Sequence, residues 1–214
     1  MAKPLLCVTV TAATTAELRQ RRDLASADAD LVELRLDTVS DPDVAGALAG
    51  RRKPAIVTCR PTWEGGHFDG SEEERQALLA QAMTLGAEYV DVEWRARFDR
   101  LIAQDPTRVV LSMHDFDGLP ADLLSRHHAM QATGAQVLKL AVRPNSLSEC
   151  IPLLDLGAQS GRSGRLVLLG MGDYGLSTRV VPNRFGSAWT YAGDLGAVGQ
   201  LGAATMLREL NFRG

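Results

Sequence analysis

Short apolar runs alternate with longer amphipathic stretches along this chain. The runs recur about every 25 residues, a usual length for one β-strand followed by one α-helix. Most of the intervening stretches carry helical patterning. The pattern therefore predicts eight strands, at residues 5–10, 30–36, 55–59, 89–94, 109–113, 136–142, 165–169 and 187–191.

Several of the amphipathic stretches carry signals for the start of a helix. Ser71 precedes three glutamates, which predicts a serine cap and an acidic first turn suited to the helix dipole. Pro120 indicates another start, because proline is favoured in the first turn. Ser146 and Glu149 have the spacing of a capping box. The last helix is expected over residues 199–210.

Eight strand–helix units predict a (β/α)8 barrel, the TIM-barrel architecture, with one domain over residues 1–214. A doubly wound open sheet is the alternative, but such sheets usually have fewer strands, and no Gly-x-Gly-x-x-Gly motif follows an early strand here. Residues 170–185 form the longest stretch with weak periodicity and contain glycines and a proline. We expect a functional loop with a short helix there.

Composition and charge exclude some functions. The chain has 214 residues, a formal net charge of −3, 45% hydrophobic residues and 23% charged residues, an ordinary globular balance. A general nucleic-acid binder would carry a basic excess, so we expect no nucleic-acid partner. No run approaches the roughly 20 apolar residues that cross a bilayer, and the N-terminus is too short for a signal peptide. We expect a cytoplasmic protein without membrane contact.

Cysteine usage argues against structural metal or disulfides. The three cysteines, Cys7, Cys59 and Cys150, are widely spaced and odd in number. No Cys-x-x-Cys pair and no Cys/His ligand spacing occurs, so we expect neither a disulfide framework nor a metal site.

Polar residues share alternate positions on several predicted strands. In a barrel, alternate residues point inward and the active site lies at the carboxyl ends of the strands. A pairing of Glu33 with Arg35 would also fit a structural ion-pair network, and His114 alone would fit a hydrogen-bonded core histidine. The sequence favours a helix surface for His127 and His128 and leaves His67 ambiguous. The inward sets are Glu33, Arg35 and Asp37; Thr58 and Arg60; Asp91 and Glu93; Ser112 and His114.

Lys139 stands apart from the other basic residues. The chain has only three lysines, and Lys139 alone lies in an apolar run, Val-Leu-Lys-Leu-Ala-Val. Burial near Arg35 and Arg60 would favour its neutral amine, which is a nucleophile suited to imine formation with a ketone or aldehyde. His114, at the end of the preceding strand, is placed by topology to move the protons.

The motifs around these residues resemble the type I 3-dehydroquinate dehydratases, relatives of the class I aldolases. The pieces occur in family order and span most of the chain, and their ordered combination is specific although each is short. They are Glu-Leu-Arg-Leu-Asp at 33–37, Thr-Cys-Arg-Pro-Thr-Trp-Glu-Gly-Gly at 58–66, Ser-Met-His-Asp-Phe at 112–116, Lys-Leu-Ala at 139–141, Met-Gly-Asp-Tyr-Gly at 171–175, Ser-Thr-Arg at 177–179, Phe-Gly-Ser at 185–187 and Gly-Gln at 199–200.

The resemblance implies a role for each matching residue. Lys139 corresponds to the imine-forming lysine, His114 to the general acid and base, and Glu64 to the carboxylate that orients the histidine. Arg179 corresponds to the arginine that pairs with the substrate carboxylate. The remaining matches are substrate-binding residues, namely Glu33, Arg35, Arg60 and Gln200. The implied reaction converts 3-dehydroquinate to 3-dehydroshikimate, in the shikimate pathway of aromatic amino acid biosynthesis, without a metal or organic cofactor.

The sequence departs from the family pattern in places. Residues 196–200 read Gly-Ala-Val-Gly-Gln where the family usually has Ser-Ala-Pro-Gly-Gln. Gly196 therefore lacks the serine hydroxyl that would contact the substrate, and the loop lacks its proline. Thr178 replaces a usual serine. The chain begins almost at the first strand, so we expect it to lack the N-terminal hairpin that closes the barrel floor in many members. The resemblance also implies a homodimer.

Two other functions remain open from the sequence. One is another imine-forming enzyme, an aldolase acting on a phosphorylated sugar, because glycines near residues 170–172 and 193–200 can supply backbone donors to phosphate. The other is a non-catalytic, carboxylate-binding barrel. The joint presence of Lys139, His114 and Glu64 argues against it.

Overall fold

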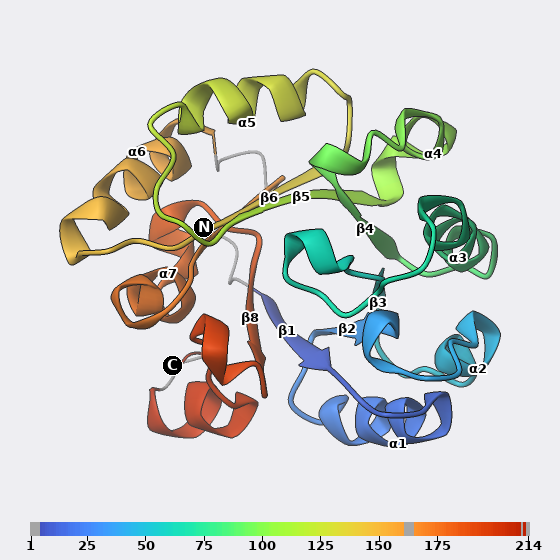
Figure 1. Cartoon of the computed structure of the whole chain (residues 1–214). Coiled ribbons are helices and arrows are strands. Elements are labelled where there is room, and N and C mark those ends of the chain that lie inside the picture. The colour runs from blue at the N-terminus through green and yellow to red at the C-terminus, as the bar shows by residue number, and fades with distance from the viewer. Residues whose placement is uncertain (1–4, 161–164, 211, 213–214) are drawn as a thin grey trace.

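Parallel strands form the centre of the molecule, and helices surround them (Figure 1). The computed structural model describes residues 5–160, 165–210 and 212. Within that part of the chain, eight strands form one sheet in the order β7-β6-β5-β4-β3-β2-β1-β8. The strands are β1 Leu5–Val10, β2 Leu31–Arg35, β3 Ala55–Thr58, β4 Tyr89–Glu93, β5 Val109–Asp115, β6 Val137–Val142, β7 Leu166–Gly170 and β8 Trp189–Gly193.

The two outer strands of that order, β7 and β8, approach each other and bring the sheet to near closure. The Ala188 amide donates to the Leu166 carbonyl at 2.8 Å. The Leu168 amide donates to Ser187 Oγ at 2.9 Å. Every pair of adjacent, hydrogen-bonded strands in that order is parallel. The (β/α)8 barrel predicted from the sequence is confirmed.

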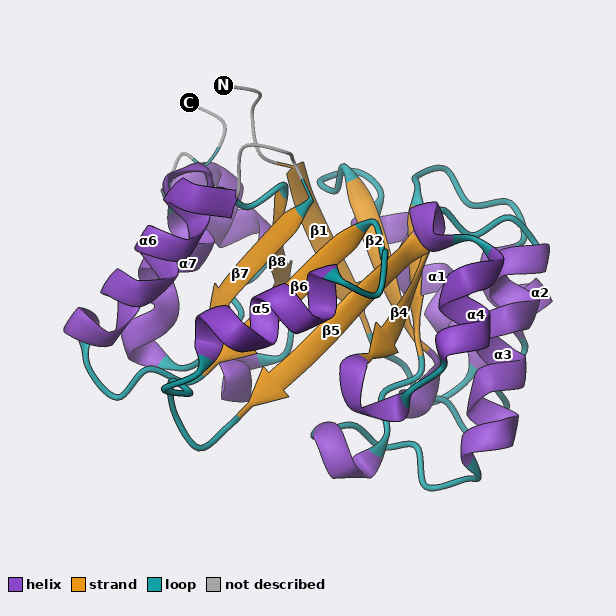
Figure 2. Ribbon diagram, turned by 90° about the horizontal axis from the view of Figure 1, so that it is seen from above, coloured by secondary structure: helices purple, strands orange, loops and turns teal. Residues whose placement is uncertain are grey.

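Helices follow most strands and cover the outside of the barrel. Figure 2 shows α1 to α4 on one side of the strands and α6 and α7 on the other. No helix in the described residues is long and apolar enough to span a membrane. The helices are α1 Thr15–Ala25, α2 Val44–Leu48, α3 Glu72–Thr84, α4 Asp99–Gln104, α5 Leu123–Gln131, α6 Ile151–Ser160 and α7 Leu176–Val180.

The predicted helix starts have mixed outcomes. Ser71 forms a complete capping box with Glu74 at the start of α3. Ser146 forms no side-chain cap, because Glu149 accepts instead from the Asn145 amide at 2.8 Å, so the predicted capping box there is wrong. A 3₁₀ turn, Leu147–Cys150, leads from that point into α6.

The two irregular segments near the C-terminus adopt short elements. Residues 170–185 contain the 3₁₀ turn Asp173–Gly175, helix α7 and a second 3₁₀ turn, Pro182–Phe185, in agreement with the predicted loop and short helix. The last helix is shorter than predicted and ends in a π-helical turn, Thr205–Glu209. The expectation about an N-terminal hairpin falls on residues 1–4, which lie outside the described residues.

The barrel interior is apolar in its lower half and charged above. Inward side chains near the amino ends of the strands form one buried cluster, which includes Cys7, Leu31, Ile56, Val110 and Val137. Two residues further along most strands, the inward positions become polar, as at Glu33, Asp91 and Lys139, whereas β7 keeps the apolar Leu169. This change places the charged groups toward the carboxyl ends, where a barrel carries its active site.

His127 lies inside the molecule rather than at a helix surface. It is 3% exposed and shares one face of α5 with the buried residues Leu123 and Met130, at helical spacings of four and three. The expectation of a surface position is therefore wrong, because that face of α5 packs onto the barrel.

Gly157 allows α6 to pack directly against the turn that precedes β8. A Cβ at this position would lie 2.2 Å from the Phe185 carbonyl oxygen. We predict that Gly157→Ala destabilises the protein by about 1–3 kcal/mol in urea denaturation, because overpacking forces the backbone to move. Gly202→Ala is the matched control, since nothing lies within 4 Å of its Cβ. Equal stability of the two variants would contradict the close approach.

Candidate active site

The predicted site residues converge on one cavity of about 350 Å³ at the carboxyl ends of the strands. Glu33 and Arg35 lie on β2, His114 on β5 and Lys139 on β6. Apolar side chains such as Leu169 and Met171 line the rest of the wall. All eight candidates line the cavity, namely Glu33, Arg35, Arg60, Glu64, His114, Lys139, Arg179 and Gln200.

The Lys139 amine is enclosed by carboxylates. Its Nζ lies 3.0 Å from Asp91 Oδ2 and 3.4 Å from Glu33 Oε1, and the side chain is 5% exposed. On another side, the Tyr191 ring centre is 4.4 Å from Nζ. The sequence favoured cations, Arg35 and Arg60, as the neighbours of this nitrogen. Its direct contacts are acids instead, because Arg35 pairs with Asp37 and Arg60 shares Asp91 with Lys139.

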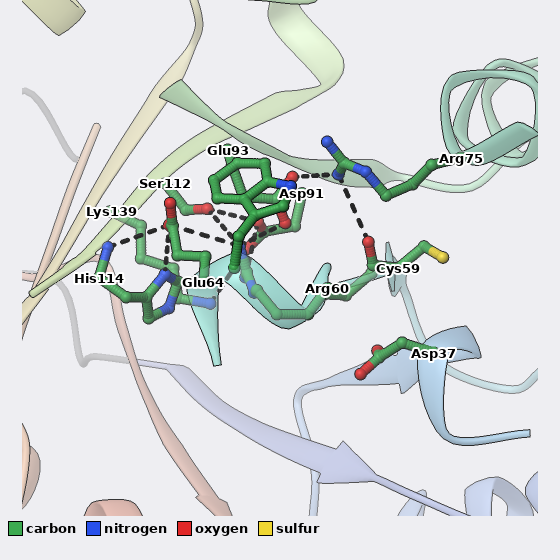
Figure 3. Close-up of polar contacts among 12 residues, drawn as sticks. Asp37, Cys59, Arg60, Glu64, Arg75, Asp91, Glu93, Ser112, His114 and Lys139 are labelled. Carbon is green, nitrogen blue, oxygen red and sulfur yellow. Dashed lines mark hydrogen bonds and ion pairs between the residues drawn. The ribbon is translucent and has the colours of Figure 1, made fainter. Parts of the chain in front are cut away.

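Arg60 joins three strands beneath the cavity (Figure 3). Its guanidinium donates to Asp91 Oδ1 at 2.8 Å, to Glu93 Oε1 at 2.6 Å and to Ser112 Oγ at 2.8 Å. Arg75 pairs with the other side of Glu93. Burial works against ionisation of Asp91, but Arg60 and Lys139 hold its pKa below the usual value. Asp91 therefore stays ionised near neutral pH.

His114 and Glu64 form a hydrogen-bonded pair. His114 Nδ1 lies 2.9 Å from Glu64 Oε1, which also accepts from the His114 amide at 3.1 Å. The turn that carries Glu64 depends on two glycines. Gly65 has φ +77°, and a Cβ there would lie 2.5 Å from the Phe116 ring; at Gly66 a Cβ would lie 2.1 Å from the Arg60 carbonyl oxygen.

Burial shifts the proton affinities of this pair in opposite directions. It raises the pKa of Glu64 to about 8, against the opposing positive charge of Arg60. Burial, together with Arg60 and Lys139, holds the pKa of His114 well below its usual value. The imidazole is therefore neutral near pH 7, and two groups with separated pKa values lie in contact beside the lysine, an arrangement suited to acid–base chemistry.

Arg179 presents an unsatisfied cation to the cavity. Its side chain is buried, and only Nη2 donates a hydrogen bond, to the Val198 carbonyl at 2.7 Å. Among the described residues, Nε and Nη1 have no partner. Burial lowers the pKa of Arg179 to about 10. A buried guanidinium with free donors is costly alone, so this position favours an anionic ligand with two oxygens.

The two β2 residues have different partners. Arg35 donates to both carboxylate oxygens of Asp37, at 2.8 and 2.6 Å, so the suggested pairing with Glu33 is replaced by this contact. Glu33 instead accepts from Thr58 Oγ1 at 2.9 Å and from Thr9 Oγ1 at 3.0 Å. These contacts fix the Glu33 carboxylate at the edge of the cavity.

Gln200 closes the cavity from the segment after β8. Its Nε2 donates to Thr9 Oγ1 at 3.1 Å, while its Oε1 is buried without a partner in the described structure. Gly196 begins a 3₁₀ turn, Gly196–Val198. The glycine that replaces the family's serine therefore lies in the turn that precedes Gln200. Ala197 and Val198 line the cavity there.

His67, left ambiguous by the sequence, also lies at the mouth of the cavity, and its backbone amide is 3.2 Å from Asp37 Oδ2.

Three residues near the Lys139 nitrogen were not singled out for a role from the sequence. Asp91 was recognised only as inward-facing, and Thr9 and Tyr191 were not considered. The available signal was strand alternation, because Tyr191 stands two residues after the inward Trp189 and Thr9 two residues after Cys7.

The part of the chain that the structure describes contains no group of three or more His, Cys, Asp or Glu residues arranged to hold a metal ion.

Comparison with known proteins identifies the family. The sequence model of the type I 3-dehydroquinase family matches residues 6–214. This chain belongs to the type I 3-dehydroquinase family. A 3-dehydroquinate dehydratase of Methanothrix thermoacetophila is 35% identical over 195 residues, covering 88% of this chain and 85% of the relative. One from Desulfotalea psychrophila is 33% identical over 191 residues, covering 83% and 84%.

Solved structures agree with membership of the type I 3-dehydroquinase family. The 3-dehydroquinate dehydratase of Geobacillus kaustophilus has a TM-score of 0.82 and 27% identity, covering 98% of this chain and 92% of that one. The type I enzyme from Clostridium difficile, at 24% identity, supports the fold alone, with a TM-score of 0.85 and coverage of 100% and 93%. The family resemblance read from the motifs is confirmed.

Proposed function

We propose that this chain converts 3-dehydroquinate to 3-dehydroshikimate through a covalent imine on Lys139. Family membership supports the reaction. The observation that carries the assignment to residues is the buried Lys139 amine at the base of a cavity that also contains the His114–Glu64 pair and the free donors of Arg179.

The first step is attack of Lys139 Nζ on the C3 ketone of the substrate. The ketone oxygen leaves as water, and the nitrogen becomes a protonated imine. This group acts as an electron sink, so it acidifies the hydrogen on the neighbouring C2. The apolar wall formed by Ala141, Leu169 and Met171 excludes bulk water from this end of the cavity.

His114 performs the proton transfers. Its neutral imidazole removes the C2 proton, and the imine becomes an enamine. The C1 hydroxyl then leaves as water, taking a proton from His114, and the conjugated imine returns. Hydrolysis of that imine frees Lys139 and releases the product. Each proton that His114 takes in the first transfer is returned in the second.

Arg179 binds the substrate carboxylate in this scheme. Its two unpartnered donors, Nε and Nη1, leave N–H groups free on a buried cation, and a carboxylate oxygen would satisfy them. Glu33, Arg35, Arg60 and Gln200 lie around the same cavity and would contact or orient the hydroxyl-bearing side of the ring. A specific observation favouring a phosphorylated sugar is lacking among the described residues, so the aldolase alternative has no independent support.

Lys139→Met is predicted to lower the rate of enone formation from 3-dehydroquinate by at least about 10³-fold, because it removes the electron sink. Ultraviolet absorbance follows the enone directly. Borohydride added with substrate should label the wild-type protein at Lys139, as read by mass mapping. Lys53→Met is the matched control and should retain full activity. A fully active Lys139→Met protein would refute the imine.

Glu64 is predicted to shape the pH dependence of proton removal. The ionised carboxylate accepts from Nδ1–H of His114 and leaves Nε2 free to take a proton, whereas the protonated acid donates to Nδ1. Because the carboxyl ionises as the pH rises through about 8, kcat/KM should rise through pH 8 and level off about one pH unit higher.

Glu64→Gln should remove that rise and lower the rate at pH 9 by at least about tenfold. Exposed Glu73 on α3 provides the control, since Glu73→Gln should leave the profile unchanged. An unaltered profile in the Glu64 variant would show that another group sets the pH dependence.

We further propose that the enzyme is a cytoplasmic homodimer. The described cysteines, Cys7, Cys59 and Cys150, are free and buried, which suits a reducing compartment. Exposed apolar side chains on α5, on α6 and in two neighbouring 3₁₀ turns support association with a second copy, and this set is called the patch below. It consists of Leu124, Leu147, Ile151, Leu154 and Tyr174, exposed by 46%, 68%, 56%, 40% and 50%.

Ile151→Glu is predicted to convert the dimer to a monomer in sedimentation equilibrium, because the charge would be buried at the interface. Leu24→Glu on α1 is the matched control. Leu24 is 78% exposed and outside the patch, so this variant should remain dimeric. A wild-type monomer, or dimers of both variants, would refute this interface.

A further inference from the structure

The Lys139 nitrogen lies in a cage of fixed composition. Asp91 on β4 and Glu33 on β2 supply the two nearest negative charges, at 3.0 and 3.4 Å, and the Tyr191 ring covers a third side. An aromatic face and two carboxylates all favour a positive charge on this nitrogen. The titratable or charged groups facing it from the surrounding strands are Cys7, Glu33, Arg60, Asp91, His114 and Tyr191.

Asp91 is the more firmly held of the two acids. Its Oδ1 accepts from Ser112 Oγ at 2.6 Å and from Arg60 Nη2 at 2.8 Å, while Oδ2 is left for Lys139. Asp91 has no exposed surface, whereas Glu33 lines the cavity. A ligand entering the cavity can displace Glu33 from the amine, but Asp91 stays beneath it.

This arrangement differs from a pocket that keeps a lysine neutral. The pKa of Asp91 lies below its usual value because Arg60 and Lys139 outweigh its burial, so the carboxylate persists across the neutral range. Two positive groups, the Arg60 guanidinium and the Lys139 nitrogen, contact the Asp91 carboxylate. If Lys139 lost its proton, the buried negative charge of Asp91 would be balanced by Arg60 alone.

We propose that Asp91 is a further catalytic residue, the counter-ion that stabilises a positive Lys139 nitrogen both before the substrate binds and after the imine forms. The inference rests on the proposed imine chemistry. It specifies how that chemistry starts and which side chain balances its charge.

The charge balance of imine formation fits this role. The ammonium and the ketone give one protonated imine and one water. Two of the three ammonium hydrogens leave with the ketone oxygen, and the third stays on nitrogen. The nitrogen carries one positive charge at both ends of the step, so a single fixed carboxylate suits both states without reorganisation. The ammonium has no lone pair, so one of its protons passes to the neutral His114 imidazole before Nζ attacks, and that proton leaves with the ketone oxygen. Asp91 favours neither the neutral amine nor the enamine.

Lysine-selective NMR tests the charge state directly, because the chain contains only three lysines. Protein labelled with ¹³C at lysine Cε should give three signals, with Lys139 assigned by its loss in Lys139→Met. In the wild type, the Lys139 signal should remain that of an ammonium at pH 7. In Asp91→Asn it should move to the neutral-amine position at a pH lower by at least about one unit, since a charge near 3 Å is removed.

Borohydride trapping gives a second readout that a purely structural role would not produce. Borohydride reduces the protonated imine. The Asp91→Asn variant should therefore trap substrate as well as the wild type at pH 6, where the nitrogen stays protonated, but at least about tenfold less well at pH 9. A loss of equal size at both pH values would indicate general damage to the site and overturn the counter-ion role.

Two control variants separate charge from packing. Ser112→Ala removes a hydrogen bond to Asp91 and keeps its charge, so the Lys139 signal should titrate as in the wild type. Asp122→Asn removes an exposed acid that pairs with Arg126 on α5, and it should change nothing. If Asp91→Asn does not fold, the wild-type spectrum still decides, because a neutral-amine signal at pH 7 would overturn the proposal.

The outcomes distinguish this inference from the proposed function. If the wild type gives no borohydride adduct, the proposed imine mechanism is wrong. The NMR result would then describe only the charge of Lys139 and not a catalytic role of Asp91. An adduct on Lys139 with an unshifted NMR titration in Asp91→Asn would retain the imine and overturn the role of Asp91.

Discussion

A charged nitrogen inside a barrel requires opposite charge within a few ångströms, and the site is organised around this constraint. Lys139 is 4% exposed, in the middle of an otherwise apolar strand. Asp91 and Glu33 supply the compensation at 3.0 and 3.4 Å. The acids in turn need donors, and Arg60 and the hydroxyls around them provide these contacts. Burial of one reactive group therefore determines the character of its neighbours on several strands.

The barrel separates three tasks in space. Apolar inward side chains near the amino ends of the strands fill the lower interior, and Ala141, Leu169 and Met171 of the same cluster line the cavity above them. Above it, the Lys139 cage and the His114–Glu64 pair hold the groups proposed for bond making and proton transfer. Arg179, on α7 outside the barrel wall, turns a buried cation toward the same cavity. This placement suits a substrate with a carboxylate at one end and a ketone at the other.

Sequence reasoning reached the strands and the site more readily than the contacts within the site. Alternation along each strand identified the inward residues, and the isolated lysine drew attention to β6. Alternation does not tell which inward side chains touch across a barrel, and for that reason arginines rather than acids were expected beside Lys139. Similarly, His127 looked like a surface residue because its polarity, rather than its spacing from Leu123 and Met130, was given weight.

The most direct test is a crystal structure of the protein reduced with borohydride in the presence of 3-dehydroquinate. The account predicts continuous density from Lys139 Nζ to the ring, the carboxylate within hydrogen-bond distance of Arg179, and Asp91 still in contact with the modified nitrogen. A ring bound without a covalent link, or linked to a different side chain, would contradict it.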